Sequence, residues 1–487
     1  MKKRRLILLC AFLGIGCLSA YWFSCHSDEP IYSGKPLSYW FKLKLSKGSV
    51  EADKILGTVG VEAVPYLRTV LRKEDSLFTK TRNAAWRKFT SSQFVPGTVR
   101  QRLGLPVSAA RARAEAAQIL QRLGPAAGAA LPELAASLNH PERAIRFTAF
   151  EAVAAIGPEH VGVVPALIET LRHPDPVMRM RSATTLGELK PPSPAVVSAL
   201  TAALHDPDFT VERAVVQALA NAGPAATGAV PGLTTMLKQP DEGVRLIAAD
   251  ALWRISPEQA NGIVALLTNM VTTTDTKLTP APTGQPGRDA SEIRMAAVDV
   301  LGEMGPLAKE AAPVVRNLLP RGGDDLRFRA ANALRRIEPA RAAELVPLFV
   351  DLLTSTNNLY HPEVIEALGE IGPPAAEAVP TLTQLLNDED EGTRLTSAMA
   401  LWQIDPLKAN RVVPVLVQLL ARDIEAGLSG SDALDVLSEM ATAAKDFAPE
   451  IRKLLGHDMD KELRKAAGEA LEKIEPTPAG RVSGSRW

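Results

Sequence analysis

Beyond its N-terminus, this 487-residue chain contains no cysteine. Cys10, Cys17 and Cys25 all lie within the first 25 residues. The rest of the chain therefore has no disulfide, no thiol nucleophile and no cysteine-type metal site. Aromatic residues make up only 5% of the chain. Alanine and leucine are abundant instead, and a core of such side chains suits helices that stack closely.

The chain also lacks a net charge, because 55 lysines and arginines are balanced by 55 aspartates and glutamates. This balance disfavours a protein that binds nucleic acid over its whole surface. The sequence contains no GxSxG, HExxH or CxxC motif and no glycine-rich dinucleotide-binding motif. We therefore expect a protein that is not an enzyme and that uses no cofactor and no metal ion.

An apolar segment follows the basic N-terminal residues MKKRR. Residues 6–23 form an apolar run of 18 residues, the lower limit for a helix that crosses a bilayer. Arg4 and Arg5 favour a cytoplasmic N-terminus, so we expect residues 1–30 to anchor an extracytoplasmic, periplasmic body. Three alternatives stay open: a cleaved signal peptide, which would give a secreted protein, lipidation at Cys17, and a purely cytosolic chain. Gly14 departs from the usual lipidation motif.

Prolines recur along the chain in two registers that share one period. Adjacent members of the first register, such as Pro125 and Pro158 or Pro339 and Pro373, are 33 or 34 residues apart. The second register, which includes Pro132 and Pro165, follows seven or eight residues later. Two registers with the same period indicate a repeated structural unit.

Each unit reads as a helical hairpin. In one unit, apolar residues at helical spacing predict a buried stripe formed by Phe147, Phe150, Val153 and Ile156. Gly157 and Pro158 should end this helix, with the glycine in the left-handed conformation. Pro165 should lie in the first turn of the second helix, where its missing N–H costs nothing.

The repeated pattern R-x-x-A-x-x-x-L-x-x-I-G-P, followed by A-V-P-x-L-x-x-x-L, resembles HEAT repeats, in particular short bacterial units such as those of the phycobilisome-lyase type. The resemblance covers about residues 51–476. It implies an all-α fold, a right-handed α-solenoid of roughly eleven or twelve antiparallel hairpins with a concave docking surface for protein partners. Residues 477–487 would form a flexible C-terminal tail.

Residues 31–50 resemble the N-terminal segment of membrane-tethered HEAT proteins from Verrucomicrobia-like bacteria. The sequence around Ser38 predicts a short capping helix that carries Trp40, Phe41 and Leu45, with the serine as its N-cap. Such a segment would cover the open apolar end of the first hairpin.

Aspartates precede the first helix of many units, where a carboxylate can accept hydrogen bonds from free N–H groups. An arginine usually follows four residues later. The aspartates are Asp175, Asp208, Asp241, Asp390 and Asp460, and the arginines are Arg179, Arg245, Arg394 and Arg464. We interpret this ladder as caps and bonds between repeats. The alternative is a stripe that faces a ligand.

Two insertions interrupt the period, near residues 79–108 and 272–291. Residues 80–122 contain nine basic residues and one acidic residue, with aromatic residues between the bases. This segment could grip an anionic surface or a partner, or it could be a solvated helix face. The candidate contact residues are Arg82, Trp86, Arg87, Lys88, Phe89 and Phe94. The polar segment 272–291 reads as a surface loop, with a clamp on a partner as the alternative.

Trp253 and Trp402 occupy the same repeat position, in ALWRISP and ALWQIDP. Tryptophans so placed usually pack between helices, but a half-exposed tryptophan can anchor a bound peptide. His140, His173, His205 and His457 share the turn between repeats. Consecutive turns lie about one helix diameter apart, which is too far for these histidines to share a metal ion.

Together these patterns predict a non-catalytic scaffold that binds protein partners through the concave face of the solenoid. We expect the second helices to form that face, helped by the basic insertion, because the caps and glycine-proline turns leave the second helices freer to vary. The alternative is a nucleic-acid-binding protein or an enzyme resembling the HEAT-like DNA glycosylases. That alternative requires a continuous positive strip on the concave face.

Overall fold

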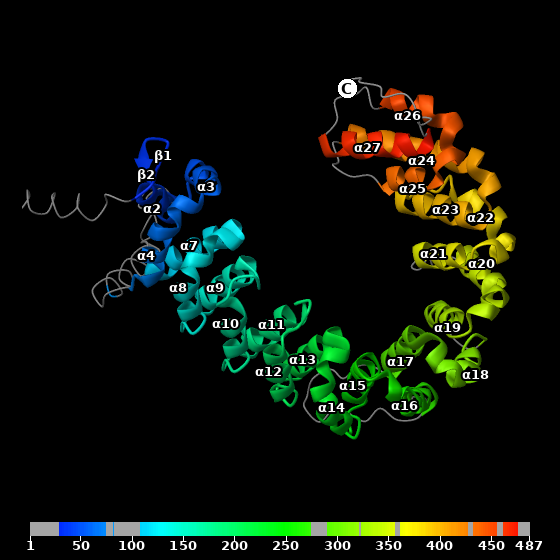
Figure 1. Ribbon diagram of the computed structural model, residues 1–487, viewed down its shortest axis with the longest axis horizontal. Helices are drawn as coiled ribbons and strands as arrows, with labels where there is room; N and C mark the ends of the chain where they lie inside the picture. Colours follow the sequence, from blue (N-terminus) through cyan, green and yellow to red (C-terminus); the bar gives the residue numbers. More distant parts are fainter. Residues whose placement is uncertain are drawn as a thin grey trace, which may run out of the picture. The chain divides into compact units, whose positions relative to one another are not determined.

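The computed structural model describes residues 29–74, 81, 108–273, 290–320, 323–355, 361–426, 432–454 and 461–475. Within these residues the only strands are the two-residue β1 (Ile31–Tyr32) and β2 (Lys35–Pro36), and nearly everything else is helical (Figure 1). In the part of the chain that the structure describes, eleven helix pairs precede a last helix, α27 (Lys461–Ile474). The prediction of an all-α solenoid with eleven or twelve hairpins is confirmed.

The chain divides into two compact units, Met1–Thr235 and Met236–Trp487. In the first unit, α2 (Leu37–Lys47) precedes the pairs α3 (Val50–Gly57) and α4 (Val64–Arg72), α7 (Ala109–Leu123) and α8 (Leu131–Ser137), α9 (Arg143–Ile156) and α10 (Val163–Thr170), α11 (Pro176–Gly187) and α12 (Pro194–Ala202), and α13 (Phe209–Ala222) and α14 (Val230–Met236). We call the two members of each pair the first helix and the second helix.

The second unit contains six further pairs before α27. They are α15 (Glu242–Ile255) and α16 (Ala260–Thr273), α17 (Ala290–Met304) and α18 (Ala312–Arg316), α19 (Asp324–Ile337) and α20 (Val346–Thr354), α21 (His361–Ile371) and α22 (Val379–Leu385), α23 (Glu391–Ile404) and α24 (Ala409–Glu425), and α25 (Asp432–Met440) and α26 (Ala448–Leu454).

The turn between the two helices of a pair has two backbone forms. Where the sequence reads Gly-Pro, the glycine has a positive φ, as in Gly157 (87°) and Gly372 (72°). The ψ of these two glycines is 159° and −145°, so they are not left-handed helical as expected, but lie in a region that is essentially restricted to glycine. Ser256 and Asp405 occupy the same position with φ of −138° and −141°.

First helices approach one another closely where small residues meet. Gly302 of α17 lies against Ala333 of α19, and an added Cβ at Gly302 would be 2.8 Å from the Ala333 Cα. Gly369 of α21 lies against Ala400 of α23 in the same way. In the first unit, Gly187 of α11 packs on α13. Each of these three helix pairs is in extensive contact.

In the second unit, the other neighbouring first helices make fewer contacts with one another, and a bulky side chain stands at the same position. This position is three residues before the turn, and it holds Trp253 in α15, Arg335 in α19 and Trp402 in α23. Each of these helices makes far fewer contacts with the next first helix than the helices that carry glycine there. The second unit therefore alternates close and wide spacings between its first helices.

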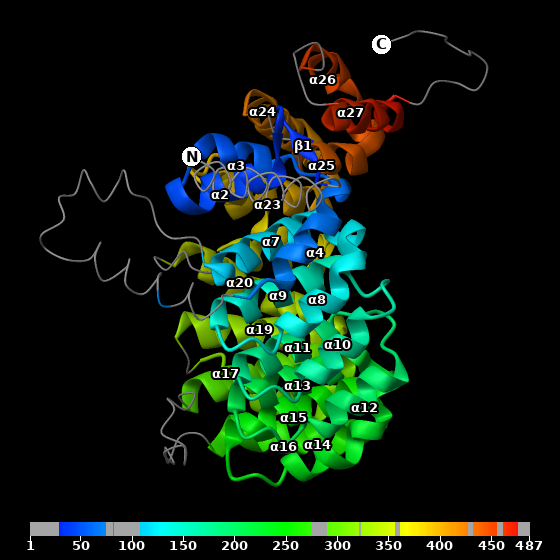
Figure 2. The same cartoon turned by 90° about the vertical axis from the view of Figure 1, so that its left-hand side faces the viewer.

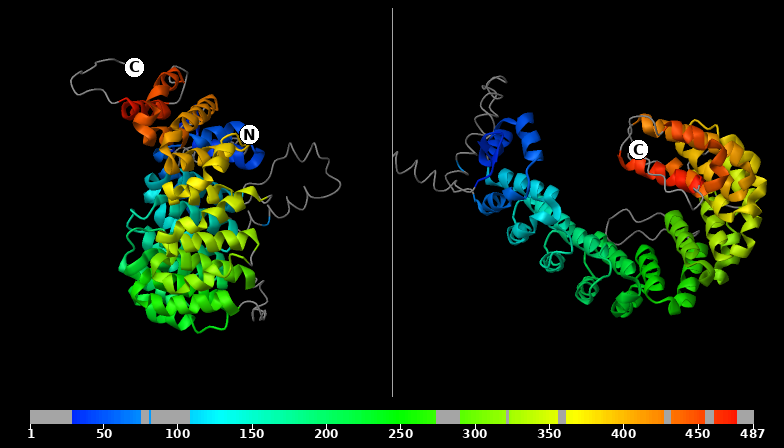
Figure 3. Two further views of the ribbon diagram at one scale, coloured as in Figure 1. Left: turned by 90° about the vertical axis from the view of Figure 1, so that its right-hand side faces the viewer. Right: turned by 45° about the horizontal axis from the view of Figure 1, so that its top comes forward.

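Second helices hardly touch one another, whereas first helices stack in a row (Figures 2 and 3). In the second unit, α17, α19 and α21 lie on the inner side of the curved stack and α16, α18 and α20 on the outer side (Figure 1). In this unit, the expectation that second helices form the concave face is therefore wrong. Glycine and alanine bring the first helices together, so the stack curves toward the row with the shorter spacing.

The N-terminal segment packs on the first repeats, but not as predicted at its start. Pro36, not Ser38, occupies the N-cap position of α2, and its side chain makes no capping hydrogen bond. The backbone N–H of Ser38 instead donates to the carboxylate of Glu29. Proline suits this position because it ends the β-hairpin and has no N–H to satisfy. Trp40, Phe41 and Leu45 are buried, as a cap requires.

Two buried carboxylates join this segment and the first pairs. Lys44 of α2 donates to Glu115 of α7 at 2.7 Å. Glu133 of α8 accepts two hydrogen bonds of 3.1 Å from Arg68 of α4, and Arg72 pairs with the same carboxylate. Burial alone would raise the pKa of Glu133, but the hydrogen bonds from the two arginines outweigh burial and lower it.

Candidate protein-docking surface

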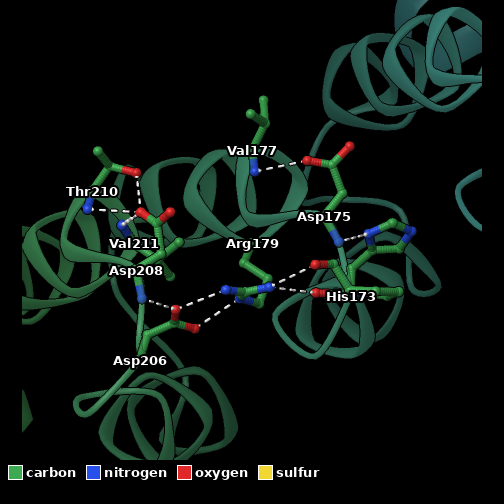
Figure 4. Close-up of polar contacts among 9 residues, drawn as sticks. His173, Asp175, Val177, Arg179, Asp206, Asp208, Thr210 and Val211 are labelled. Atoms are coloured by element: carbon green, nitrogen blue, oxygen red, sulfur yellow. Dashed lines mark hydrogen bonds and ion pairs between the residues drawn. The ribbon is translucent and has the colours of Figure 1, made fainter. Parts of the chain in front are cut away.

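The predicted capping aspartates lie at the N-termini of first helices (Figure 4). Asp175 accepts from the Val177 N–H at 3.1 Å, and Asp208 accepts from the Thr210 N–H at 2.9 Å. Asp241 and Asp390 accept from the N–H groups three residues later. Asp460 lies outside the described residues. These carboxylates stabilise helix ends and leave little capacity for a ligand.

The arginines of the ladder bind the turn that precedes their own helix. Arg179 donates through Nη1 to the carbonyls of His173 and Pro174, at 2.8 and 3.1 Å. Its Nε and Nη2 donate to both carboxylate oxygens of Asp206, in the next repeat, at 2.7 and 2.8 Å (Figure 4). Arg146, four residues after Glu142, reaches the next cap, Asp175, at 2.5 Å.

Arg245 and Arg394 make the same contacts with backbone carbonyls. Arg245 donates to the carbonyls five and six residues before it, both at 2.9 Å, and Arg394 does so at 3.1 and 2.8 Å. Each also forms an ion pair with the glutamate three residues before it. Arg464 is exposed on α27. Arg179, Arg245 and Arg394 therefore hold turns in place.

The basic insertion cannot be compared with its prediction. Arg82, Trp86, Arg87, Lys88, Phe89 and Phe94 lie outside the described residues, as does most of segment 272–291. The expected anchor, residues 6–23, also lies outside them. Of the helices in the described ranges, none combines the length and the apolar character that a membrane span needs.

Trp253 and Trp402 are both half-buried. The Trp253 indole donates to Asp250 at 3.1 Å, and the Arg254 guanidinium lies 5.0 Å from the centre of the Trp253 ring. Trp402 forms no such polar contact with the side chains that the structure describes. The two tryptophans are therefore neither part of the buried core nor fully exposed. Each lies on a first helix that makes few contacts with the next first helix.

From α15 to α19, four acidic residues of the first helices pair with two arginines. Arg254 pairs with Asp250 at 2.9 Å and with Glu303 of the next first helix. Arg329 pairs with Asp325 at 2.6 Å and with Asp299. Burial raises the pKa of Asp299 and Glu303, and the nearby arginines only partly offset this rise. These carboxylates already have partners.

The residues that line a cavity between α17, α19 and α21 show which helix positions face the inner side. The cavity has a volume of about 300 Å³, and it is lined by Asp299, Gly302 and Glu303 of α17, by Arg329, Asn332 and Arg336 of α19, and by Glu363 of α21. We count each position back from the residue that directly follows its helix, which is Gly305, Glu338 or Gly372. The residues named here then lie two, three, six or nine positions before it. The same positions in α21, α23 and α25 should therefore face the same side.

In α21 and α25 these positions carry acidic residues. Glu363, Glu366, Asp435 and Glu439 are exposed, and none forms a hydrogen bond or an ion pair with another described residue. Between these two helices, α23 presents the half-exposed Met399 and Trp402. We call these six residues the acidic face. Of these six residues, the sequence analysis predicted only Trp402 as a contact residue; the other five follow from the register once the inner row is known.

The acidic face suits cations and an apolar group, but not a metal ion or an anion. Within the ranges that the structure covers, no three histidine, cysteine, aspartate or glutamate side chains are placed to hold a metal ion. Four unpaired carboxylates repel phosphate groups, so the described inner side from α15 to α25 offers no continuous positive strip for nucleic acid. A tryptophan and a methionine between carboxylates can receive an apolar side chain.

Comparisons with known proteins agree with the repeat. A family model for HEAT repeats matches residues 164–253 and 346–429. Among solved structures, importin beta shares 14% identity over 90% of this chain and 68% of that chain, with a TM-score of 0.44. Kap121p bound to Ste12p shares 14% identity over 90% and 48%, with a TM-score of 0.39. The chain therefore spans about half the length of Kap121p.

A third solved structure, YibA of E. coli, shares 15% identity over 63% of this chain and 98% of that chain, with a TM-score of 0.39. These likenesses concern the fold alone. No curated protein sequence matches the chain.

Proposed function

We propose that this HEAT-repeat chain is a non-catalytic scaffold whose acidic face binds a protein segment rich in lysine and arginine. The observation that carries the proposal is the set of four exposed, unpaired carboxylates on α21 and α25, on either side of Met399 and Trp402. A stack of helices gains nothing in stability from like charges that face the same side. A partner of opposite charge would remove this repulsion.

The chemistry of the face also defines the partner. Exposed ion pairs contribute about 0.2–1 kcal/mol each, so several are needed for useful affinity. An apolar or aromatic side chain between the basic residues of the partner would fit beside Trp402, because buried aromatic contacts contribute most of the energy in many interfaces. The partner we propose is therefore a basic segment that also carries an apolar residue.

Neutralising the acidic face should weaken binding of such a segment. We expect the triple variant Glu366→Gln, Asp435→Asn and Glu439→Gln to bind a synthetic peptide of alternating lysine and leucine about tenfold more weakly at low ionic strength. The difference should shrink as salt is added, because salt screens exposed charges. Fluorescence anisotropy titration with the full chain measures both effects.

A matched control changes the net charge equally at another place. Glu310, Glu377 and Glu389 are exposed and lie at turns rather than on the inner side of the first helices. Changing all three to glutamine should leave the affinity nearly unchanged. Equal weakening by both triple variants would show that the peptide responds to net charge alone, and the proposal would then fail.

We also propose that residues 6–23 tether the scaffold to a membrane, with the repeats on the extracytoplasmic side. The support is the apolar run of 18 residues after Arg4 and Arg5. A reporter fused after residue 30 should be active when it requires export and inactive when it requires the cytoplasm. A reporter that works only in the cytoplasm would exclude this placement.

A further inference from the structure

A second cavity lies in the first unit, far along the sequence from the acidic face. Its volume is about 410 Å³, within the range of small-molecule pockets. Apolar walls come from Ile168 and Leu171 at the end of α10 and from Ala199 and Ala203 at the end of α12. The two second helices make few contacts here, and the alanines of α12 do not fill the space between them.

One end of the cavity is polar, and part of that end is already satisfied. Arg179 uses Nε, Nη1 and Nη2 in hydrogen bonds to Asp206 and to the carbonyls of His173 and Pro174. Asp206 accepts from Arg179 and also from the Asp208 N–H, at 2.9 Å (Figure 4). This ion pair is internally neutral and offers a ligand little further capacity.

The remaining polar groups are donors. His173 is only 8% exposed and lines the cavity. Its Nδ1 accepts the Asp175 N–H at 2.9 Å, so in the neutral ring the proton is on Nε2. Nε2 has no acceptor among the described residues. The atom is not fully buried and its residue lines the cavity, so its N–H is free to donate to a ligand there.

Two further groups stand at the rim because the turn before α13 differs from the others. In earlier turns, His140 and His173 accept the N–H two residues later, but before α13 this acceptor is Asp206. His205 is thereby released from the turn, and it lines the cavity together with Arg172. Both side chains are exposed, and neither side chain forms a hydrogen bond or an ion pair with other residues of the described part.

We propose that this cavity binds an apolar group that carries a carboxylate. The source is either a small carboxylic acid or the C-terminal residue of a protein chain. The apolar group lies between α10 and α12, and the carboxylate accepts hydrogen bonds from His173 Nε2 and from Arg172. A charge-assisted hydrogen bond to a buried donor is stronger than a neutral one, so the charge on the ligand matters.

A pair of probes tests the carboxylate. In calorimetric titrations of the full chain, 3-phenylpropanoate should bind at least about tenfold more tightly than 3-phenylpropanamide, which has the same shape and no charge. Ala199→Leu should abolish binding of the acid because leucine fills the cavity. The control Ala195→Leu, at an exposed site on the same helix, should not change it. Equal affinity for acid and amide, or unchanged binding in Ala199→Leu, would overturn the proposal.

Two variants test the donors. His173→Asn keeps an oxygen that can accept the Asp175 N–H, as the Asp206 and Asp388 side chains do in their turns, but removes the ring donor. Arg172→Gln changes an exposed side chain and should leave the fold intact. Each should weaken binding of 3-phenylpropanoate about five- to tenfold. If neither does, the carboxylate is not recognised here.

A short peptide that ends in phenylalanine distinguishes the sources. Tighter binding of the free-acid peptide than of 3-phenylpropanoate, with loss on C-terminal amidation, would identify a protein C-terminus. Binding of the small acid alone would identify a small molecule. Binding of neither probe would contradict the proposal. Since the cavity and the acidic face lie in different units, failure of one proposal does not affect the other.

Discussion

Gly302→Ala is expected to lower the free energy of unfolding by about 2–3 kcal/mol, the cost of overpacking a tight contact. The new Cβ would be 2.8 Å from the Cα and 2.9 Å from the Cβ of Ala333. These atoms belong to the backbone and the first side-chain atom of α19, so no rotamer change relieves the clash. The two first helices would have to separate along their length.

Urea denaturation followed by circular dichroism measures this loss. Gly468→Ala is the matched control, because Gly468 also lies inside a helix, α27, but is exposed and has no atom within 4 Å of an added Cβ. Alanine should stabilise α27 there by up to about 1 kcal/mol, through helix propensity alone. If both variants shift stability in the same direction, the close contact between α17 and α19 is not real.

Gly372→Ala is expected to destabilise the protein by about 1–3 kcal/mol for a different reason. Gly372 has φ of 72° and ψ of −145°, a conformation that a residue with a Cβ adopts only under strain. No atom blocks the new methyl group closer than 3.9 Å, so the cost arises from the backbone and not from packing. Thermal and urea unfolding of the variant should show the loss.

The chain offers the reciprocal change as a control. Ala441 occupies the same turn position after α25 and has a φ of 44°, unusual for a residue with a side chain. Ala441→Gly should therefore stabilise the protein by about 1 kcal/mol. Gly323→Ala, at an exposed glycine with φ of −64° and open space around it, should have little effect. Destabilisation by Ala441→Gly would contradict the backbone argument.

The sequence predicts most of the repeat because its prolines and glycines act locally. Pro165 opens the second helix α10 and Gly157 ends the first helix α9, as their own backbone chemistry requires. The predicted apolar stripe is correct for Phe150, Val153 and Ile156, which are buried. Phe147 is 38% exposed, so it does not belong to the buried stripe. The Arg181 guanidinium packs on its ring, 4.0 Å from the ring centre.

The features that the sequence did not predict depend on contacts between repeats. A glycine three residues before the turn, as in Gly302 or Gly369, reads locally as a weak helix former. Only the next helix reveals that the glycine sets the spacing, and this spacing decides which row is concave. The acidic face was missed for the same reason. Glu366 and Asp435 lie far apart in the chain and share a face only once the inner row is known.

The displacement of His205 is a third feature of this kind. All four histidines appear equivalent in the sequence, but the turn before α13 is one residue longer than the turn before α11. The extra residue places Asp206 where a histidine acts in the two earlier turns. Counting back from the capping aspartate, rather than from the preceding proline, would have revealed the offset.

The alternation of close and wide spacings has a mechanical consequence. In the second unit, α17 packs tightly on α19 and α21 on α23, through close glycine–alanine contacts. If the unit is stretched, it should bend between α15 and α17, between α19 and α21, and between α23 and α25, because fewer contacts join these helices. These are the positions of Trp253, Arg335 and Trp402. Trp402 lies at one of these positions and also belongs to the acidic face, so bending there would change the surface to which we propose that a basic segment binds.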